Sequence, residues 1–172
     1  MNRETDLILI MGVSGCGKST VGMGLAERLG GVFLEGDDFH PPENKQLMGA
    51  GIPLTDKERW PWFDNLRDEI EKALANSDKR PVILSSSALK PEYRRYLLRG
   101  YENRCRLVFL RGDFDLIHGR MQARQHEYMP ASLLESQFAT LVEPGDDEEA
   151  LVLGIESPIE EIISELENVF RV

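Results

Sequence analysis

The chain has 172 residues, which suits one domain with a sizeable core, and its 41% hydrophobic and 29% charged residues are typical of globular proteins. The 30 acidic and 20 basic side chains give a net charge of −10, which argues against a nucleic-acid or anionic-membrane partner. Two cysteines are too few for a disulfide framework, and the apolar run Leu7 to Val13 is far shorter than the roughly 20 residues that span a bilayer. We therefore expect a cytoplasmic protein without a membrane partner.

Short apolar runs alternate with helical patterns along the chain. Asp6 to Met11 is predicted to be a buried strand, followed by a glycine-rich turn and a helix from Lys18 to Leu29. A strand at Val32 to Glu35 precedes a helix from His40 to Met48, and a longer helix runs from Thr55, with a capping-box pattern, to about Ala75. The remaining predicted elements are strands at 81–85, 106–110 and 151–155 and helices at 91–98, 115–124, 131–141 and 158–170. Continuous apolar strands between helices indicate one α/β domain over 1–172, with a parallel sheet covered on both faces.

The turn after the first strand matches a phosphate-binding pattern. Gly12 to Ser19 fits G-x-x-x-x-G-K-[ST] completely and lies between a predicted strand and a predicted helix. Glycines let backbone N–H groups surround phosphate oxygens, Lys18 would reach the β- and γ-phosphates, and the Ser19 hydroxyl would ligate Mg²⁺ directly. The pattern predicts a nucleoside triphosphate site formed by Gly12, Val13, Ser14, Gly15, Cys16, Gly17, Lys18, Ser19 and Thr20.

Acidic residues follow the second strand at Glu35, Asp37 and Asp38. Ligands of open α/β sheets bind at the carboxyl edge, and phosphoryl transfer to an alcohol needs a carboxylate near the attacking hydroxyl. Strand alternation would turn Glu35 and Asp37 to the same side, toward the phosphate loop. We predict Asp37 to be the catalytic base and Glu35 to contact Mg²⁺ through water; the alternative is that these acids only cap the next helix.

Several blocks of this sequence resemble the gluconate kinases (gluconokinases). Gly36 to Pro41 matches the G-D-x-x-H-P signature of that family. Further matching blocks lie at 51–56, 59–62, 87–90, 110–115 and 136–141, so the resemblance extends from about Leu7 to Ile155. It implies the P-loop kinase fold, similar to shikimate and adenylate kinases. That fold has a five-stranded parallel sheet in the order 2-3-1-4-5, substrate-binding helices at about 40–76 and a mobile lid at about 120–136.

The resemblance also implies a reaction. ATP would phosphorylate the terminal hydroxyl of D-gluconate, giving 6-phospho-D-gluconate, with Mg²⁺ as cofactor and commonly as a homodimer. Gluconate carries a carboxylate and five hydroxyls, so its pocket needs cationic and polar partners. The family pattern places His40, Arg59, Lys90 and Arg94 near the sugar acid, together with Asp37.

Arg120 and Arg124 lie four residues apart and hence on one helix face. In the related kinases such a pair closes over the triphosphate and stabilises the charge of the transition state. We therefore predict that both arginines bind ATP and act in catalysis with Lys18 and Asp37. The chain departs from the family lid pattern R-x-G-H-F, because His126 and Glu127 replace its glycine and histidine.

The sequence is also compatible with other functions. The acceptor could be another small polyol acid such as shikimate, or a nucleotide, although Ser85 to Ser87 stand where shikimate kinases carry a glycine triplet. A catalytically silent nucleotide-binding module is the alternative outside enzymes, and retention of Lys18, Ser19 and Asp37 weighs against it. An assay panel of sugar acids, shikimate and nucleoside monophosphates separates these possibilities.

Overall fold

The computed structural model describes residues 4–123 and 131–171. Within them, five parallel strands form one sheet in the order β2-β3-β1-β4-β5, which confirms the predicted fold class and strand order. The strands are β1 (Leu7–Met11), β2 (Val32–Glu35), β3 (Val82–Ser85), β4 (Cys105–Arg111) and β5 (Leu151–Gly154).

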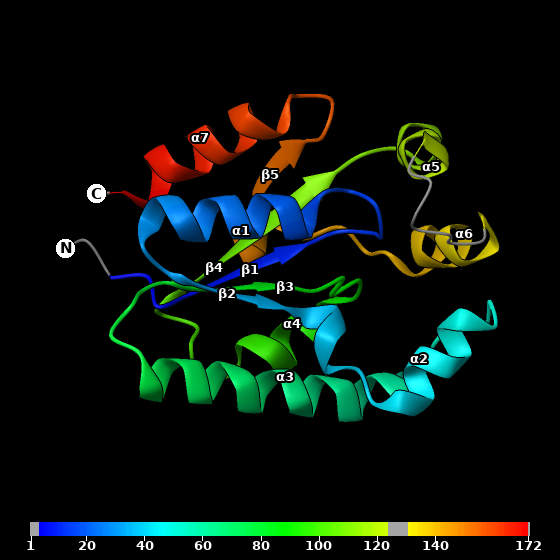
Figure 1. Ribbon diagram of the computed structural model, residues 1–172, viewed down its shortest axis with the longest axis horizontal. Helices are drawn as coiled ribbons and strands as arrows, with labels where there is room; N and C mark the ends of the chain where they lie inside the picture. Colours follow the sequence, from blue (N-terminus) through cyan, green and yellow to red (C-terminus); the bar gives the residue numbers. More distant parts are fainter. Residues whose placement is uncertain (1–3, 124–130, 172) are drawn as a thin grey trace.

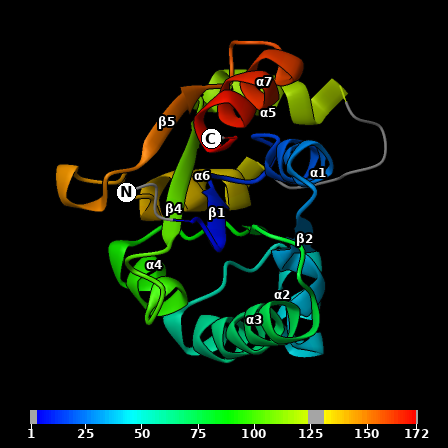
Figure 2. The ribbon, with the colours of Figure 1, turned by 90° about the vertical axis from the view of Figure 1, so that its left-hand side faces the viewer.

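Helices cover both faces of this sheet. The α-helices are α1 (Lys18–Leu29), α2 (Pro42–Gly49), α3 (Asp56–Asn76), α4 (Pro91–Leu98), α5 (Phe114–Ala123), α6 (Ala131–Thr140) and α7 (Ile159–Phe170), and two 3₁₀ turns are η1 (Gly36–Phe39) and η2 (Asp146–Glu148). Helices α1 and α7 lie on one face and α3 and α4 on the other, whereas α2, α5 and α6 lie near the carboxyl ends of the strands (Figures 1 and 2). None of the described helices is both long and apolar enough to cross a membrane.

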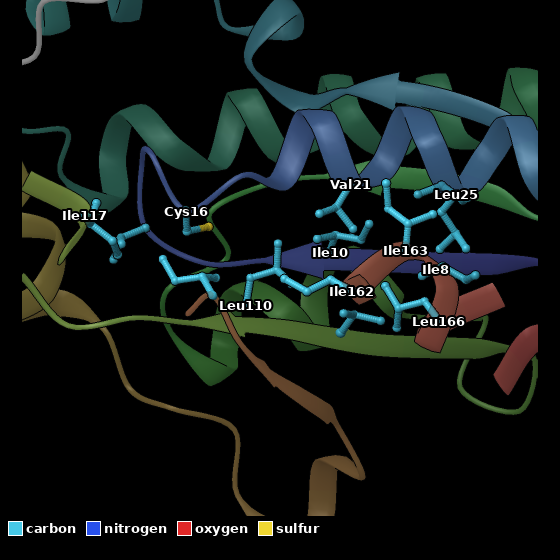
Figure 3. Packing of buried hydrophobic residues seen from close by; sticks show 14 of the residues in the cluster. Ile8, Ile10, Cys16, Val21, Leu25, Leu110, Ile117, Ile162, Ile163 and Leu166 are labelled. Carbon is cyan, nitrogen blue, oxygen red and sulfur yellow. The ribbon is translucent and has the colours of Figure 1, made fainter. Parts of the chain in front are cut away.

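All five residues of the central strand β1 are fully buried, which explains why its sequence is apolar throughout. Ile8 and Ile10 pack with α1 and α7 in one cluster, shown in Figure 3. Leu7, Leu9 and Met11 point to the opposite face and pack with α3 and α4. A strand with helices on both sides has no solvated face, so the alternation that marks a half-exposed strand is missing.

Helix α3 runs unbroken through Pro61, a residue type that often kinks or ends a helix. The proline removes one backbone hydrogen-bond donor, but Trp62, Phe63, Leu66 and Ile70 bury one face of the helix and hold it in place. At its start, the Glu58 carboxylate accepts the Thr55 backbone N–H at 2.8 Å, as the capping-box pattern predicts.

Candidate active site

The phosphate loop connects β1 to α1 at the carboxyl edge of the sheet. Gly17 precedes the first residue of α1 with φ of +100°, a left-handed conformation that glycine adopts without steric cost. The Lys18 ammonium donates to the carbonyl oxygens of Gly12 and Val13, both at 3.0 Å. The loop is therefore a turn of the shape that the sequence pattern predicts, with its lysine folded over it.

Helix α6 is tied to this loop by Gln137. Its Oε1 accepts the Ser14 backbone N–H at 2.7 Å, and its Nε2 donates to the Ser14 hydroxyl at 3.0 Å. Both atoms of one carboxamide thus hold one loop residue. No sequence motif assigns a role to Gln137, although it lies in a block that resembles the gluconate kinases.

Ser19 and Glu35 lie side by side next to the loop. The Ser19 hydroxyl donates to the Glu35 carboxylate, whose other oxygen accepts the Ser85 hydroxyl at 2.8 Å. Glu35 and Ser85 are register partners on β2 and β3, which explains that contact. A hydroxyl and a carboxylate are oxygen donors of the type Mg²⁺ prefers. In the described part of the chain no three His, Cys, Asp or Glu residues form a metal-binding group. The donor set therefore fits a magnesium ion whose remaining ligands are water molecules and phosphate oxygens.

Asp37 reaches the site by a different route from the one expected. Strand β2 ends at Glu35, so the strand alternation predicted for Glu35 and Asp37 is wrong, and the chain turns into η1 at Gly36. A Cβ at Gly36 would lie 2.1 Å from the Ser85 carbonyl oxygen, so the turn needs glycine to pack against β3. The indole N–H of Trp62 donates to the Gly36 carbonyl at 2.9 Å and fixes the turn to α3.

The buried His40 side chain lies beside Asp37. Its Nε2 lies 3.7 Å from Asp37 Oδ1, and its ring stacks on Trp62 at 3.8 Å between centroids. The His40 side chain is 3% exposed, whereas that of Asp37 is 77% exposed and available to a ligand. The imidazole of His40, with a smaller contribution from the Lys18 ammonium, holds the pKa of the Asp37 carboxyl below its ordinary value of 3.8.

A cavity of about 220 Å³ brings the predicted groups together. Lys18, Asp37, His40 and Arg59 all line it, in a setting of polar and apolar side chains contributed by Ser14, Met48, Pro53, Leu54, Trp62, Ser87, Leu89, Leu133, Ser136 and Gln137. Residues from the phosphate loop, η1, α3 and α6 therefore meet around one space. The cavity offers a cation and a carboxylate at the phosphate loop and a second cation, Arg59, from α3.

Two predicted acceptor residues do not line this cavity. The ammonium of Lys90 lies 3.4 Å from Asp56 Oδ1 at the start of α3. Arg94 is 1% exposed, its Nε and Nη2 donate to the Glu148 carboxylate at 2.6 and 2.8 Å, and its Nη1 donates to the Ala88 carbonyl. The expected acceptor contact of Arg94 is thus replaced by a buried ion pair, because its position on α4 turns it toward η2.

Arg120 lies beside the phosphate loop. It lines a second pocket of about 360 Å³ with Gly15, Cys16, Gly17, Ala123, Ser157 and Ile159, and its Nη2 donates to the Ile155 carbonyl at 2.6 Å. This position agrees with a contact to a nucleotide on the loop. The predicted partner Arg124 and the altered lid positions His126 and Glu127 lie outside the described residues.

The sequence also gave no role to Asn44 and Tyr93. Asn44 Nδ2 lies 3.2 Å from His40 Nδ1, and the Tyr93 hydroxyl accepts a hydrogen bond from Arg59 Nη1 at 2.8 Å. Each acts on a predicted site residue and does not itself line the cavity. A residue that acts only through another site residue has no sequence motif of its own. The one signal for it in the sequence is its position in or near a block that resembles the gluconate kinases.

Comparison with known proteins adds evidence that is independent of this geometry. A family model described as an AAA domain matches residues 7–144. The thermoresistant gluconokinase of Escherichia coli K12 is 39% identical over 171 residues, covering 99% of this chain and 96% of that protein. The crystal structure of a gluconokinase from Sinorhizobium meliloti 1021 superposes with a TM-score of 0.84 at 40% identity, over 95% of this chain and 90% of that one. A shikimate kinase from Bacteroides thetaiotaomicron has a TM-score of 0.67 at 14% identity, over 97% and 99%, and shares the fold.

Proposed function

Because the chain belongs to the gluconokinase family of P-loop kinases, we propose that it transfers the γ-phosphoryl group of ATP to the terminal hydroxyl of D-gluconate. The products are 6-phospho-D-gluconate and ADP. One observation carries this proposal beyond family membership. A single cavity joins Lys18 on the phosphate loop, the Asp37 carboxylate and the Arg59 guanidinium, which suit a phosphate, a hydroxyl and a carboxylate respectively.

The nucleotide binds on the loop from Gly12 to Thr20 in this proposal. Backbone N–H groups and Lys18 hold the phosphates, and Arg120 and Arg124 add positive charge beside them. Ser19 would ligate Mg²⁺ directly and Glu35 would hold one of its waters, as their shared contact supports. Mg²⁺ bound there supplies charge neutralisation on the phosphate oxygens.

Asp37 accepts the proton of the acceptor hydroxyl while that oxygen forms a bond to the γ-phosphorus. The bond from that phosphorus to the β–γ bridging oxygen breaks, and ADP leaves with the bonding electron pair. His40 and Lys18 favour the ionised carboxylate, so Asp37 is unprotonated and ready at neutral pH. His40 also orients the carboxylate from its buried position on Trp62.

In this proposal the acceptor carboxylate binds at Arg59, which lines the same cavity as the phosphate loop. The terminal hydroxyl then lies at Asp37. A cation for a carboxylate and a carboxylate for a hydroxyl suit a sugar acid as the acceptor. Lys90 contributes positive charge near Arg59, because both cations lie on the ring of Tyr93.

A coupled ADP-release assay tests the proposal. Mg·ATP is mixed with D-gluconate and, in parallel reactions, with shikimate, other sugar acids and nucleoside monophosphates. We expect saturable turnover with gluconate and far lower kcat/KM with the other acceptors. Preferred turnover of another acid would reassign the acceptor pocket, and ATP binding without turnover of any acceptor would favour the silent module.

We also propose a cytoplasmic homodimer. The family resemblance supports the dimer, and the two free cysteines, Cys16 and Cys105, suit a reducing compartment. Light scattering behind a sizing column should give twice the mass of one chain at micromolar concentration. A mass equal to one chain across that range would contradict the dimer.

A further inference from the structure

Tyr93 on α4 contacts two of the cations that the sequence assigned to the acceptor, Arg59 and Lys90. The Tyr93 hydroxyl accepts a hydrogen bond from Arg59 Nη1 at 2.8 Å and donates its own proton to the Asp56 carboxylate. The Arg59 guanidinium carbon lies 5.2 Å from the centroid of the Tyr93 ring, and the Lys90 ammonium lies 5.4 Å from it. Lys90 Nζ is also 3.4 Å from Asp56 Oδ1.

The direction of these bonds restricts Arg59. Because Asp56 takes the only hydroxyl proton of Tyr93, the oxygen lone pairs of that hydroxyl are left for Arg59. One N–H of the guanidinium is then committed to Tyr93, and the planar group has four more donors in fixed directions. Arg59 lines the cavity, whereas Tyr93 is 1% exposed and does not. Tyr93 therefore acts on the cavity through Arg59.

We propose that Tyr93, held by Asp56, is a positioning residue that sets the Arg59 guanidinium to receive the carboxylate of the acceptor. Its contribution is selectivity for an acidic acceptor over a neutral one of the same shape. The inference rests on the proposed gluconate site. An unpositioned arginine would have to lose side-chain freedom each time a carboxylate binds, and the fixed contact removes that cost beforehand.

The same helix pair carries a second unit of similar composition, which offers a matched control. Tyr96, one turn further along α4, donates its hydroxyl proton to Asp64 on α3. The Arg67 guanidinium carbon lies 5.7 Å from the Tyr96 ring centroid, and Arg67 Nη1 donates to the Tyr96 carbonyl at 2.7 Å. None of these three residues lines the cavity. Loss of the Tyr96 hydroxyl perturbs the α3–α4 contact without touching Arg59.

The test compares D-gluconate with D-gluconamide, a neutral amide of the same carbon chain, by kcat/KM at subsaturating acceptor. We expect the wild type to prefer gluconate, and Tyr93→Phe to lower that preference about tenfold, the scale of one hydrogen bond to a charged group. Tyr96→Phe should keep the wild-type preference. Melting curves of both variants show that each is folded.

A double-mutant cycle with Arg59→Ala identifies the route of the effect. If Tyr93 acts through Arg59, then Tyr93→Phe should change the preference no further once Arg59 is alanine. Equal losses on both acceptors, or full additivity with Arg59→Ala, would overturn the inference. A wild type that turns over gluconate without preferring it to the amide also overturns it, whereas absence of gluconate turnover removes the proposed function itself.

Discussion

Asp37 combines an exposed carboxylate with a buried partner, His40, whose neutral tautomer is set by its neighbours. Asn44 Nδ2 donates to the Glu58 carbonyl at 3.0 Å and faces His40 Nδ1 at 3.2 Å. Since a carbonyl can only accept, the nitrogen of the Asn44 amide faces His40, and Nδ1 accepts from it. The proton of a neutral His40 is then on Nε2, which faces Asp37. The imidazole therefore stabilises the ionised form of the proposed base.

Asp37→Asn should lower kcat by about 10²- to 10⁴-fold, the usual scale for loss of a general base, with little change in KM for ATP. The amide cannot take the hydroxyl proton, and the phosphate loop stays intact. Steady-state kinetics with gluconate and ATP varied in turn measures both constants. Asp38→Asn is the control, because Asp38 is exposed and does not line the cavity. An effect confined to KM for ATP would show that Asp37 serves the nucleotide.

Arg59→Ala should weaken acceptor binding by about 1.5–3 kcal/mol, the scale of a hydrogen bond to a charged group. The Arg59 guanidinium lines the cavity from α3, so its loss removes the proposed partner of the acceptor carboxylate. KM for gluconate reports the change while KM for ATP serves as the internal control. An unchanged KM for gluconate would make Arg59 a structural residue.

At the scale of elements, η1 connects the sheet to the acceptor side of the site. It follows β2 directly, packs on β3 at Gly36 and is hydrogen-bonded to Trp62 of α3. These contacts place Asp37 on the lining of the cavity, together with Lys18. The position of the base thus depends on three elements that are distant in sequence.

Gly36→Ala should destabilise the protein by about 1–3 kcal/mol and lower kcat, because the added methyl group meets the Ser85 backbone and forces η1 away from β3. Gly119→Ala is the matched control. Gly119 lies inside α5, and a Cβ there would meet no atom within 4 Å other than the backbone of its own helix. This change should therefore stabilise the chain by up to about 1 kcal/mol. Urea denaturation and turnover are measured for both. Wild-type stability and turnover in Gly36→Ala would show that η1 tolerates displacement.

At the scale of the whole molecule, the two sides of the site come from opposite faces of the sheet and meet in one cavity. The phosphate loop leads into α1 on one face, whereas Arg59 comes from α3 on the other (Figure 2). Helix α4 is joined to the segment before β5 by the Arg94–Glu148 pair, in which both carboxylate oxygens are used. This pair connects the helix layer that carries Arg59 to the segment before the edge strand β5.

Glu148→Gln should lower the free energy of unfolding at pH 7 by about 3 kcal/mol, because it leaves the buried guanidinium of Arg94 without its counter-charge. Hydrogen bonds from Arg94 hold the pKa of Glu148 below its ordinary value of 4.5. A carboxylate with a lowered folded-state pKa stabilises the protein above about pH 4.5 and loses that contribution as the pH falls through the folded-state value. The variant should therefore lose less stability than the wild type in that acidic range.

Urea denaturation from pH 7 to pH 3 measures both effects. Glu149→Gln is the control, because Glu149 is exposed and its substitution should stay within about 0.5 kcal/mol. Equal acid sensitivity of Glu148→Gln and the wild type would contradict the assignment.

The sequence by itself determined the α/β class, the phosphate loop and most element boundaries, since each depends on local patterns. A buried parallel strand is an apolar run, and a phosphate loop needs its glycines and lysine at fixed spacing. The family blocks also located Asp37, His40 and Arg59, which the cavity brings together. The strand order was likewise expected from the family and confirmed.

Only the tertiary structure decided which neighbouring side chains act at the site. Tyr93 and Arg94 are adjacent on α4, yet Tyr93 supports Arg59 while Arg94 pairs with Glu148, which is far along the chain. Likewise, Asp37 reached the cavity through a 3₁₀ turn where strand alternation was expected. Helical and strand periodicity say which face of an element is buried, but not which partner it meets. That choice depends on the packing of elements that the sequence keeps apart.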